Sequence, residues 1–208
     1  MKATFYERLA SYIIDFLIVS SLLSIICYKL PDNSSTYIEE INTIYESYTK
    51  NEITPTDFAD KYLDIVYNEE KKDILTPTIS VILTIGYFIV FQYLNNGQTL
   101  GKKILKIQVV DKNTNTPPSI LKGTIRTIFI LNIASNIITI ILRTCVDKNT
   151  YLITSTILSI FNWIFLVITI VLMISKSSCR GLHDLMANTI VIKERSWYNA
   201  WINRSRIN

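Results

Sequence analysis

Four long apolar runs constrain the fold of this chain most strongly. They cover approximately residues 12–30, 75–94, 125–142 and 152–175. Each run is close to the roughly 20 helical residues that cross a bilayer core of about 30 Å. A soluble fold would require four helices that are apolar on every face within 208 residues, a pattern that suits burial in lipid better than a small core. The runs therefore predict four membrane-spanning helices.

Charges between the runs predict the orientation of the chain. The connection 95–124 holds five Lys against one Asp, and the tail from Lys176 holds six Lys or Arg against two acidic residues. The segment 31–73 holds eleven Asp or Glu against four Lys. Because cytoplasmic loops are rich in Lys and Arg, we expect both termini in the cytoplasm and the acidic segment outside.

The acidic insertion 31–74 carries two amphipathic patterns that predict an extracytoplasmic helical hairpin. Thr36 and Glu39 fit a capping box for the first helix. For the second helix Thr54 is the expected N-cap, followed by a proline and by Asp57. The hairpin either packs on the outer mouth of the bundle or collects cations or a partner.

Two short segments predict a small β element on the cytoplasmic side. "ILKIQVVD" in the connection 95–124 and "ANTIVIKE" after the fourth run both have strand character, and we expect them to pair. The predicted fold class is all-α membrane: a four-transmembrane-helix bundle with this two-stranded element and the outer hairpin. Residues 1–194 form the membrane domain. The basic, aromatic residues 195–208 form a cytoplasmic tail suited to the headgroup region.

Asp15 is a charged residue inside the first apolar run, where a carboxylate is not expected. Arg8 lies seven positions earlier on the same helical face, and its long side chain can reach the interface. The side chain of Asp15 is too short for that. Insertion scales assign an Asp at mid-helix a cost of about 2.5–3.5 kcal/mol. Asp15 therefore needs a partner, a water-filled cavity or a proton.

Polar residues of the third run are the expected partners of Asp15. Asn132, Asn136 and Thr139 follow one another at spacings of four and three, which predicts one polar helical face. Arg126 lies near the inner end of the same run, at a depth comparable with that of Asp15. Polar groups in spanning helices turn toward the bundle interior. These side chains either join helices by hydrogen bonds or line an ion pathway.

Catalytic and metal-binding constellations are not visible in the sequence. His183, the single histidine, could relay protons with Asp184, or form a structural turn with Arg180 and Asp184. Cys27 and Cys145 both fall near outer helix ends, where they either pair or act as small apolar residues. We expect no enzyme activity and no metal, because neither a metal-ligand set nor a nucleophile–base pair appears. We also expect no cofactor and no nucleic-acid partner.

Four motifs in order resemble those of the RDD family of bacterial membrane proteins. They are "RLASYIID", "NGQTLGKKILKIQVVD", "GTIRT" and "RGLHDLMANTIVI". The family is named for one arginine and two aspartates. The resemblance assigns Arg8 and Asp15 to the first two, and Asp184 to the third, with Asp111 as its rival. The motif residues on the cytoplasmic side are Gly97, Gln98, Gly101, Lys102, Arg180 and His183.

The resemblance implies a multi-pass protein of the bacterial plasma membrane, and it leaves two functions open. The first, which is the leading hypothesis, is ion-coupled transport such as cation/proton exchange. In it Asp15 faces the polar stripe of the third run and alternately binds a proton and a cation. The second is a non-transporting scaffold or accessory subunit in which Asp15, Arg126 and the motifs form a static clasp. The expected partners are the lipid bilayer, a small cation or proton, and further copies of the chain, because four helices make a thin shell for a pathway.

Overall fold

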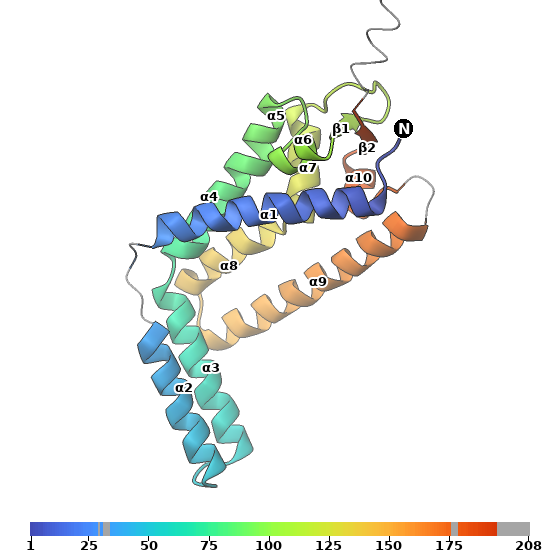
Figure 1. Ribbon diagram of the computed structural model, residues 1–208. Coiled ribbons are helices and arrows are strands. Elements are labelled where there is room, and N and C mark those ends of the chain that lie inside the picture. Colours follow the sequence, from blue (N-terminus) through green and yellow to red (C-terminus); the bar gives the residue numbers. More distant parts are fainter. Residues whose placement is uncertain (29, 31–33, 176–178, 195–208) are drawn as a thin grey trace, which may run out of the picture. The chain divides into compact units, whose positions relative to one another are not determined.

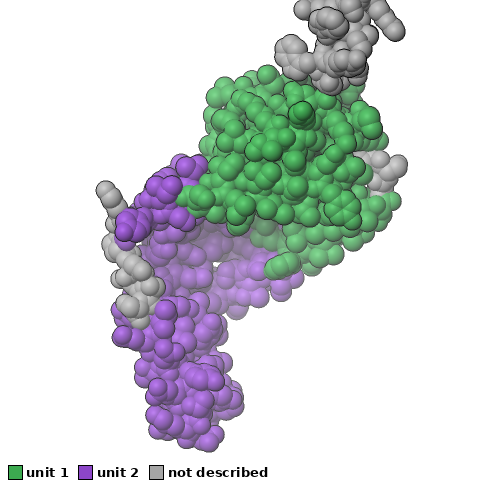
Figure 2. Space-filling view, in the orientation of Figure 1, with its two compact units in different colours: residues 1–21, 83–133, 162–208 green, residues 22–82, 134–161 purple. Residues whose placement is uncertain are grey.

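The computed structural model describes residues 1–28, 30, 34–175 and 179–194. The chain divides into two compact units, coloured separately in Figure 2. The first unit comprises residues 1–21, 83–133 and 162–208, and the second comprises residues 22–82 and 134–161. The predicted tail 195–208 lies outside the described residues.

Three helices in the described part of the chain are long and apolar enough to cross a membrane. They are α1 (Phe5–Cys27), the helical stretch Leu75–Leu94 and α9 (Lys148–Ser175). A fourth span results if the broken pair α7 (Ile120–Ile130) and α8 (Ile133–Cys145) counts as one. The predicted multi-pass, mostly helical architecture is therefore confirmed (Figure 1).

The third predicted span differs from the continuous helix expected over 125–142. Helix α7 ends at Ile130, and Asn132 in the following break has a φ of 52°. Asparagine adopts this left-handed conformation more readily than most residues. The break separates Asn132 from the helix that carries Asn136 and Thr139. The predicted single polar face was wrong, because helical spacing alone does not reveal a break in the helix.

Helix α1 buries polar residues and exposes apolar ones. Its buried residues are Arg8, Ser11 and Asp15, whose spacings of three and four place them on one face. Leu17 is 58% exposed and Ile25 is 72% exposed. Water would disfavour this pattern, whereas lipid covers the apolar side and the protein interior receives the polar side.

The span Leu75–Leu94 changes its winding near its end. It begins as α4 (Leu75–Ile85), continues as the π-helix η1 (Gly86–Phe91) and closes with α5 (Gln92–Leu94). Such π turns are uncommon and frequently occur at functional sites. This turn carries Tyr87, whose ring stacks on that of Phe91 with centroids 5.4 Å apart.

The predicted β element is present in the first unit. Strands β1 (Ile107–Asp111) and β2 (Thr189–Lys193) pair antiparallel, with Ile107 opposite Lys193. An isolated two-stranded ribbon is marginally stable. Here a small core supports it, formed by Ala3, Ile107, Val109 and Val191. The short helices α6 (Leu100–Ile104) and α10 (Leu182–Met186) adjoin the two strands (Figure 1).

The second unit contains the predicted helical hairpin, formed by α2 (Ser34–Thr49) and α3 (Pro55–Lys72). Thr54 caps α3, because its side chain accepts from the Asp57 N–H and the Asp57 carboxylate accepts from the Thr54 N–H. The predicted N-cap at Thr54 is confirmed, and the reciprocal contact with Asp57 makes it a capping box. The capping box predicted at Thr36 was wrong, because α2 already begins at Ser34.

A polar network joins α3 to the start of α9 within the second unit. Tyr151 is 2% exposed, donates to the Glu70 carboxylate, and accepts from Nε of Arg143 at 3.2 Å. Nζ of Lys148 lies 2.6 Å from a carboxylate oxygen of Asp64. The three cysteines, Cys27, Cys145 and Cys179, are free.

Candidate functional site

Asp184 lies at the centre of a buried cluster in the first unit. Its side chain is 0% exposed. One carboxylate oxygen accepts from Nη2 of Arg8 at 2.7 Å, and the other accepts from Nε of Arg126 at 2.8 Å. The hydroxyl of Thr189 also donates to the second oxygen, at 3.2 Å. These contacts join α10 to α1, α7 and β2.

Two further side chains surround Asp184. Arg180 donates to the backbone carbonyl oxygens of Thr189 and Asp184, both at 3.0 Å. Burial lowers the pKa of His183 to about 3, so this imidazole is neutral near pH 7. Burial by itself would raise the pKa of Asp184, but the positive charges of Arg126 and Arg8 hold that pKa below its ordinary value. Asp184 is therefore a carboxylate that neutralises buried arginines.

Asp15 is held by a separate set of donors. One oxygen accepts from the Tyr87 hydroxyl at 2.7 Å and from the Gly101 N–H at 2.8 Å. The other oxygen accepts from the Thr99 hydroxyl. The Tyr87 hydroxyl also accepts from the Leu100 N–H at 3.1 Å. Asp15 and Tyr87 thus accept hydrogen bonds from the first N–H groups of α6, which have no partner within the helix.

Glycines allow this close approach. A Cβ on Gly101 would lie 2.4 Å from the backbone oxygen of Ser11 and 2.9 Å from the Asp15 carboxylate. Gly97 has a φ of 83°, and a Cβ there would lie 2.4 Å from the backbone oxygen of Val109. The motif "GQTLG" therefore brings its backbone against both α1 and β1, which a larger residue would prevent.

Lys102 is buried directly after this motif. Its ammonium donates to the side-chain oxygen of Gln92 at 2.7 Å. Burial is the main reason that the pKa of Lys102 falls to about 7, and the positive charge of Arg126 acts in the same direction. Lys102 can therefore gain or lose a proton near neutral pH.

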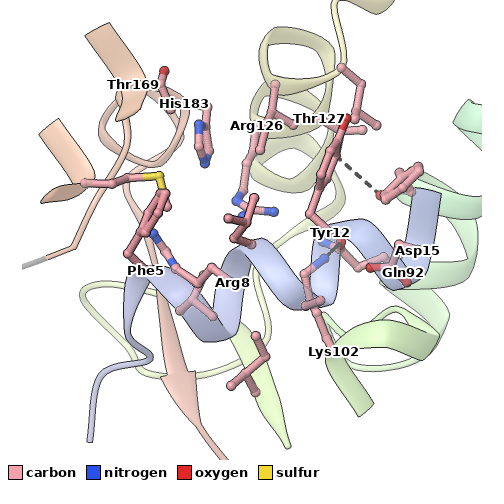
Figure 3. A pocket seen from close by; sticks show the side chains of 18 of the residues that line it. Phe5, Arg8, Tyr12, Asp15, Gln92, Lys102, Arg126, Thr127, Thr169 and His183 are labelled. Carbon is pink, nitrogen blue, oxygen red and sulfur yellow. Dashed lines mark hydrogen bonds between the residues drawn. The ribbon is translucent and has the colours of Figure 1, made fainter. Parts of the chain in front are cut away.

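A cavity of about 200 Å³ lies in the first unit, and Asp15, Lys102 and His183 are among the residues that line it (Figure 3). The labelled side chains around it come from α1, α5, α6, α7, α9 and α10. Its charged lining residues are Arg8, Asp15, Lys102 and Arg126. Apolar residues such as Phe88 and Leu166 complete the wall. The cavity therefore combines a polar, mainly cationic part with an apolar part.

The structure brings most of the predicted site residues together, but not the third-run amides. Asn136 is exposed, and Thr139 donates to the backbone oxygen of Ser135 in its own helix. The hydrogen bonds of Asp15 go to Tyr87, Thr99 and Gly101 instead of Asn132, Asn136 or Thr139, so the expected partners of Asp15 were wrong. Asp111 pairs with Lys122, whereas Asp184 contacts Arg8.

Several site residues were not predicted. Thr99 lies inside the quoted motif "NGQTLG", and Ser11 shares the helical face of Arg8 and Asp15, so both carried a usable signal. Tyr87 and Thr169 sit within apolar runs and carried none. Among the described residues, no group of three or more His, Cys, Asp or Glu side chains is placed to hold a metal ion.

These features define a multi-pass membrane protein with a buried arginine–aspartate cluster at the ends of its helices. The sequence matches the RDD family over residues 2–188. The chain belongs to the RDD family. No curated protein and no solved structure matches it.

Proposed function

We propose that this protein is a non-enzymatic membrane scaffold or accessory subunit, in which the family's charged residues form a structural clasp. The observation that carries the proposal is the position of Asp184 between Arg8 and Arg126, at 2.7 and 2.8 Å. Two arginines on different helices share one carboxylate, so the three side chains hold α1, α7 and α10 together.

The contacts of Asp15 support the same role. Its two carboxylate oxygens accept hydrogen bonds from three donors, and Asp15 is only 1% exposed. A cation that bound this carboxylate would have to replace hydrogen bonds that fix α6 against α1. Buried polar groups that are fully paired make structure rigid, which suits a clasp better than a site that is repeatedly emptied.

Ion-coupled transport with Asp15 as the proton or cation site is the second candidate. One observation favours it: Asp15 and Lys102 line the same cavity of about 200 Å³. Lys102, with a pKa of about 7, could exchange protons as a cation enters or leaves.

Proteoliposomes separate the two functions. A pH gradient is imposed, Na⁺, Li⁺ or K⁺ is added, and the decay of the gradient is compared between wild type and Asp15→Asn. The clasp predicts no cation-dependent decay in either protein and a lower unfolding temperature for Asp15→Asn. Cation-dependent decay in wild type that is absent in a folded Asp15→Asn protein would establish transport and exclude the scaffold role.

We further propose that the protein resides in the bacterial plasma membrane as a homo-oligomer with both termini in the cytoplasm. A variant whose single thiol is Cys145 should react with an impermeant maleimide in intact cells. A cysteine placed at the exposed Asn113, in a background without the native thiols, should react only after permeabilisation. Light scattering of the purified protein tests the oligomer.

A further inference from the structure

Four buried polar atoms beside the cavity lack a hydrogen-bond partner within the described part of the chain. They are Nε of Arg8, Oγ of Ser11, Oγ1 of Thr169 and Nδ1 of His183. All four residues line the cavity, and each is at most 9% exposed. Buried polar atoms are nearly always paired, so an unpaired set calls for an explanation.

Three of these four atoms can act as hydrogen-bond donors. Nε of Arg8 is a donor, and the two hydroxyls can each donate one hydrogen bond. Nε2 of His183 lies 3.5 Å from the Asp184 carboxylate, so a proton on Nε2 leaves Nδ1 as an acceptor that a hydroxyl can satisfy. An acceptor in the cavity would satisfy the three donors Arg8, Ser11 and Thr169. Ser11 and Thr169 belong to different helices, α1 and α9, so the residues with unpaired donors line the cavity from separate elements.

The charges around the cavity favour an anionic acceptor. Arg8, Lys102 and Arg126 contribute three positive groups to the lining, and Asp15 contributes one negative group. Asp184 already engages both arginines. With Lys102 protonated, one positive charge remains without a carboxylate in this set, and an unpaired buried charge is costly.

The size and the wall of the cavity limit the ligand. An engineered cavity of about 150 Å³ holds benzene, and this cavity measures about 200 Å³. Phe88, Ile130 and Leu166 are among its apolar lining residues. A ligand of this size can therefore carry one short apolar group in addition to its charged group.

We propose that the cavity of the first unit binds a small organic carboxylate. Its carboxylate oxygens accept hydrogen bonds from the unpaired donors and neutralise Lys102, and its apolar body lies against Phe88 and Leu166. Arginine and lysine bind carboxylates through charge-assisted hydrogen bonds. This inference goes beyond the clasp and does not depend on it, because the clasp concerns contacts within the chain.

Isothermal titration of the full-length protein in nanodiscs tests the proposal with benzoate as the probe. Benzamide has the same shape without the charge, benzylamine carries the opposite charge, and inorganic phosphate lacks the apolar body. We expect benzoate to bind and benzamide to bind with an affinity at least roughly tenfold lower. We expect no binding of benzylamine or phosphate. Equal binding of benzoate and benzamide, or no binding of benzoate at millimolar concentration, would overturn the proposal.

Variants locate the binding site. Thr169→Val keeps the shape of the side chain and removes an unpaired hydroxyl, so the protein should fold normally and bind benzoate several-fold more weakly. Lys102→Met should weaken binding further. Lys148→Met removes a lysine that pairs with Asp64 in the second unit and serves as the matched control. Unchanged benzoate affinity in both cavity variants would contradict the assignment to this cavity.

Discussion

Arg8 and Asp184 lie 176 positions apart in the chain and form a buried ion pair, with Nη2 of Arg8 2.7 Å from Oδ2 of Asp184. We predict that Asp184→Asn strongly destabilises the protein. The substitution leaves Arg8 and Arg126 without their shared carboxylate. Breaking a buried pair by removing one partner costs about 3–5 kcal/mol. Thermal unfolding in detergent, followed by tryptophan fluorescence, measures the loss.

The matched control for this prediction is Asp111→Asn. Asp111 pairs with Lys122, whose side chain is 34% exposed, so water can replace much of the lost contact. Such partly exposed pairs contribute less to stability than fully buried ones. If Asp184→Asn and Asp111→Asn lowered the unfolding temperature equally, the central role of Asp184 would be refuted.

Gly101 provides a second prediction. Gly101→Ala should destabilise the protein by about 1–3 kcal/mol, the usual cost of overpacking, because the new Cβ would lie 2.4 Å from the backbone oxygen of Ser11. Gly123→Ala is the control, since a Cβ at Gly123 meets nothing within 4 Å. In helix α7 this alanine should stabilise by up to about 1 kcal/mol. Similar unfolding temperatures for the two variants would show that the close approach at Gly101 is unimportant.

The difference between what sequence could and could not predict follows from the kind of signal. The spans, the strand pair and the cap at Thr54 depend on local patterns, and the structure contains the strand pair, the cap and three of the four predicted spans as long helices, with the third predicted span present as the broken pair α7 and α8. The partners of Asp15 depend on a π turn at Tyr87 and on the backbone of Gly101. Neither feature has a periodic signature in the sequence. The regularly spaced amides of the third run do have one, so the sequence pattern favoured them as partners of Asp15.

The pairing of Arg8 with Asp184 illustrates the same limit. The sequence showed that Arg8 and Asp15 share a helical face, and it showed that Asp184 belongs to a motif. The contact between Arg8 and Asp184 joins α1 to α10, which lie far apart in the sequence. Spacing within one helix gives no information about such a long-range contact.

The network around Tyr151 gives a third prediction, which concerns the second unit alone. Tyr151→Phe removes the hydroxyl that donates to Glu70 and accepts from Arg143. Without this hydroxyl, Glu70 and Arg143 each lose a hydrogen-bond partner, so we expect the free energy of unfolding to fall by about 1–3 kcal/mol. Tyr45→Phe is the control, because Tyr45 is 57% exposed. Hydrogen exchange of α3 and of the start of α9 should rise in Tyr151→Phe only. Equal exchange in both variants would show that the network does not stabilise this unit.

Lys102 makes the stability of the protein depend on pH. Its pKa in the folded state is about 7, below the ordinary value of about 10.4. Between these values the unfolded chain binds more protons at this position than the folded protein, so the contribution of Lys102 to stability rises with pH. Below pH 7 both states are protonated and the full cost of burying the charge remains.

We therefore predict that Lys102→Met changes the pH dependence of unfolding. The groups that act on Lys102 are Arg126, Arg8, Asp15 and Asp184. From pH 7 to pH 10 the stability of wild type relative to Lys102→Met should increase, with a slope of at most about 1.4 kcal/mol per pH unit for one proton. Unfolding temperatures of both proteins, measured at each pH in the same detergent, give this difference. Parallel curves would mean that Lys102 keeps an ordinary pKa and that its charge is compensated in the folded protein.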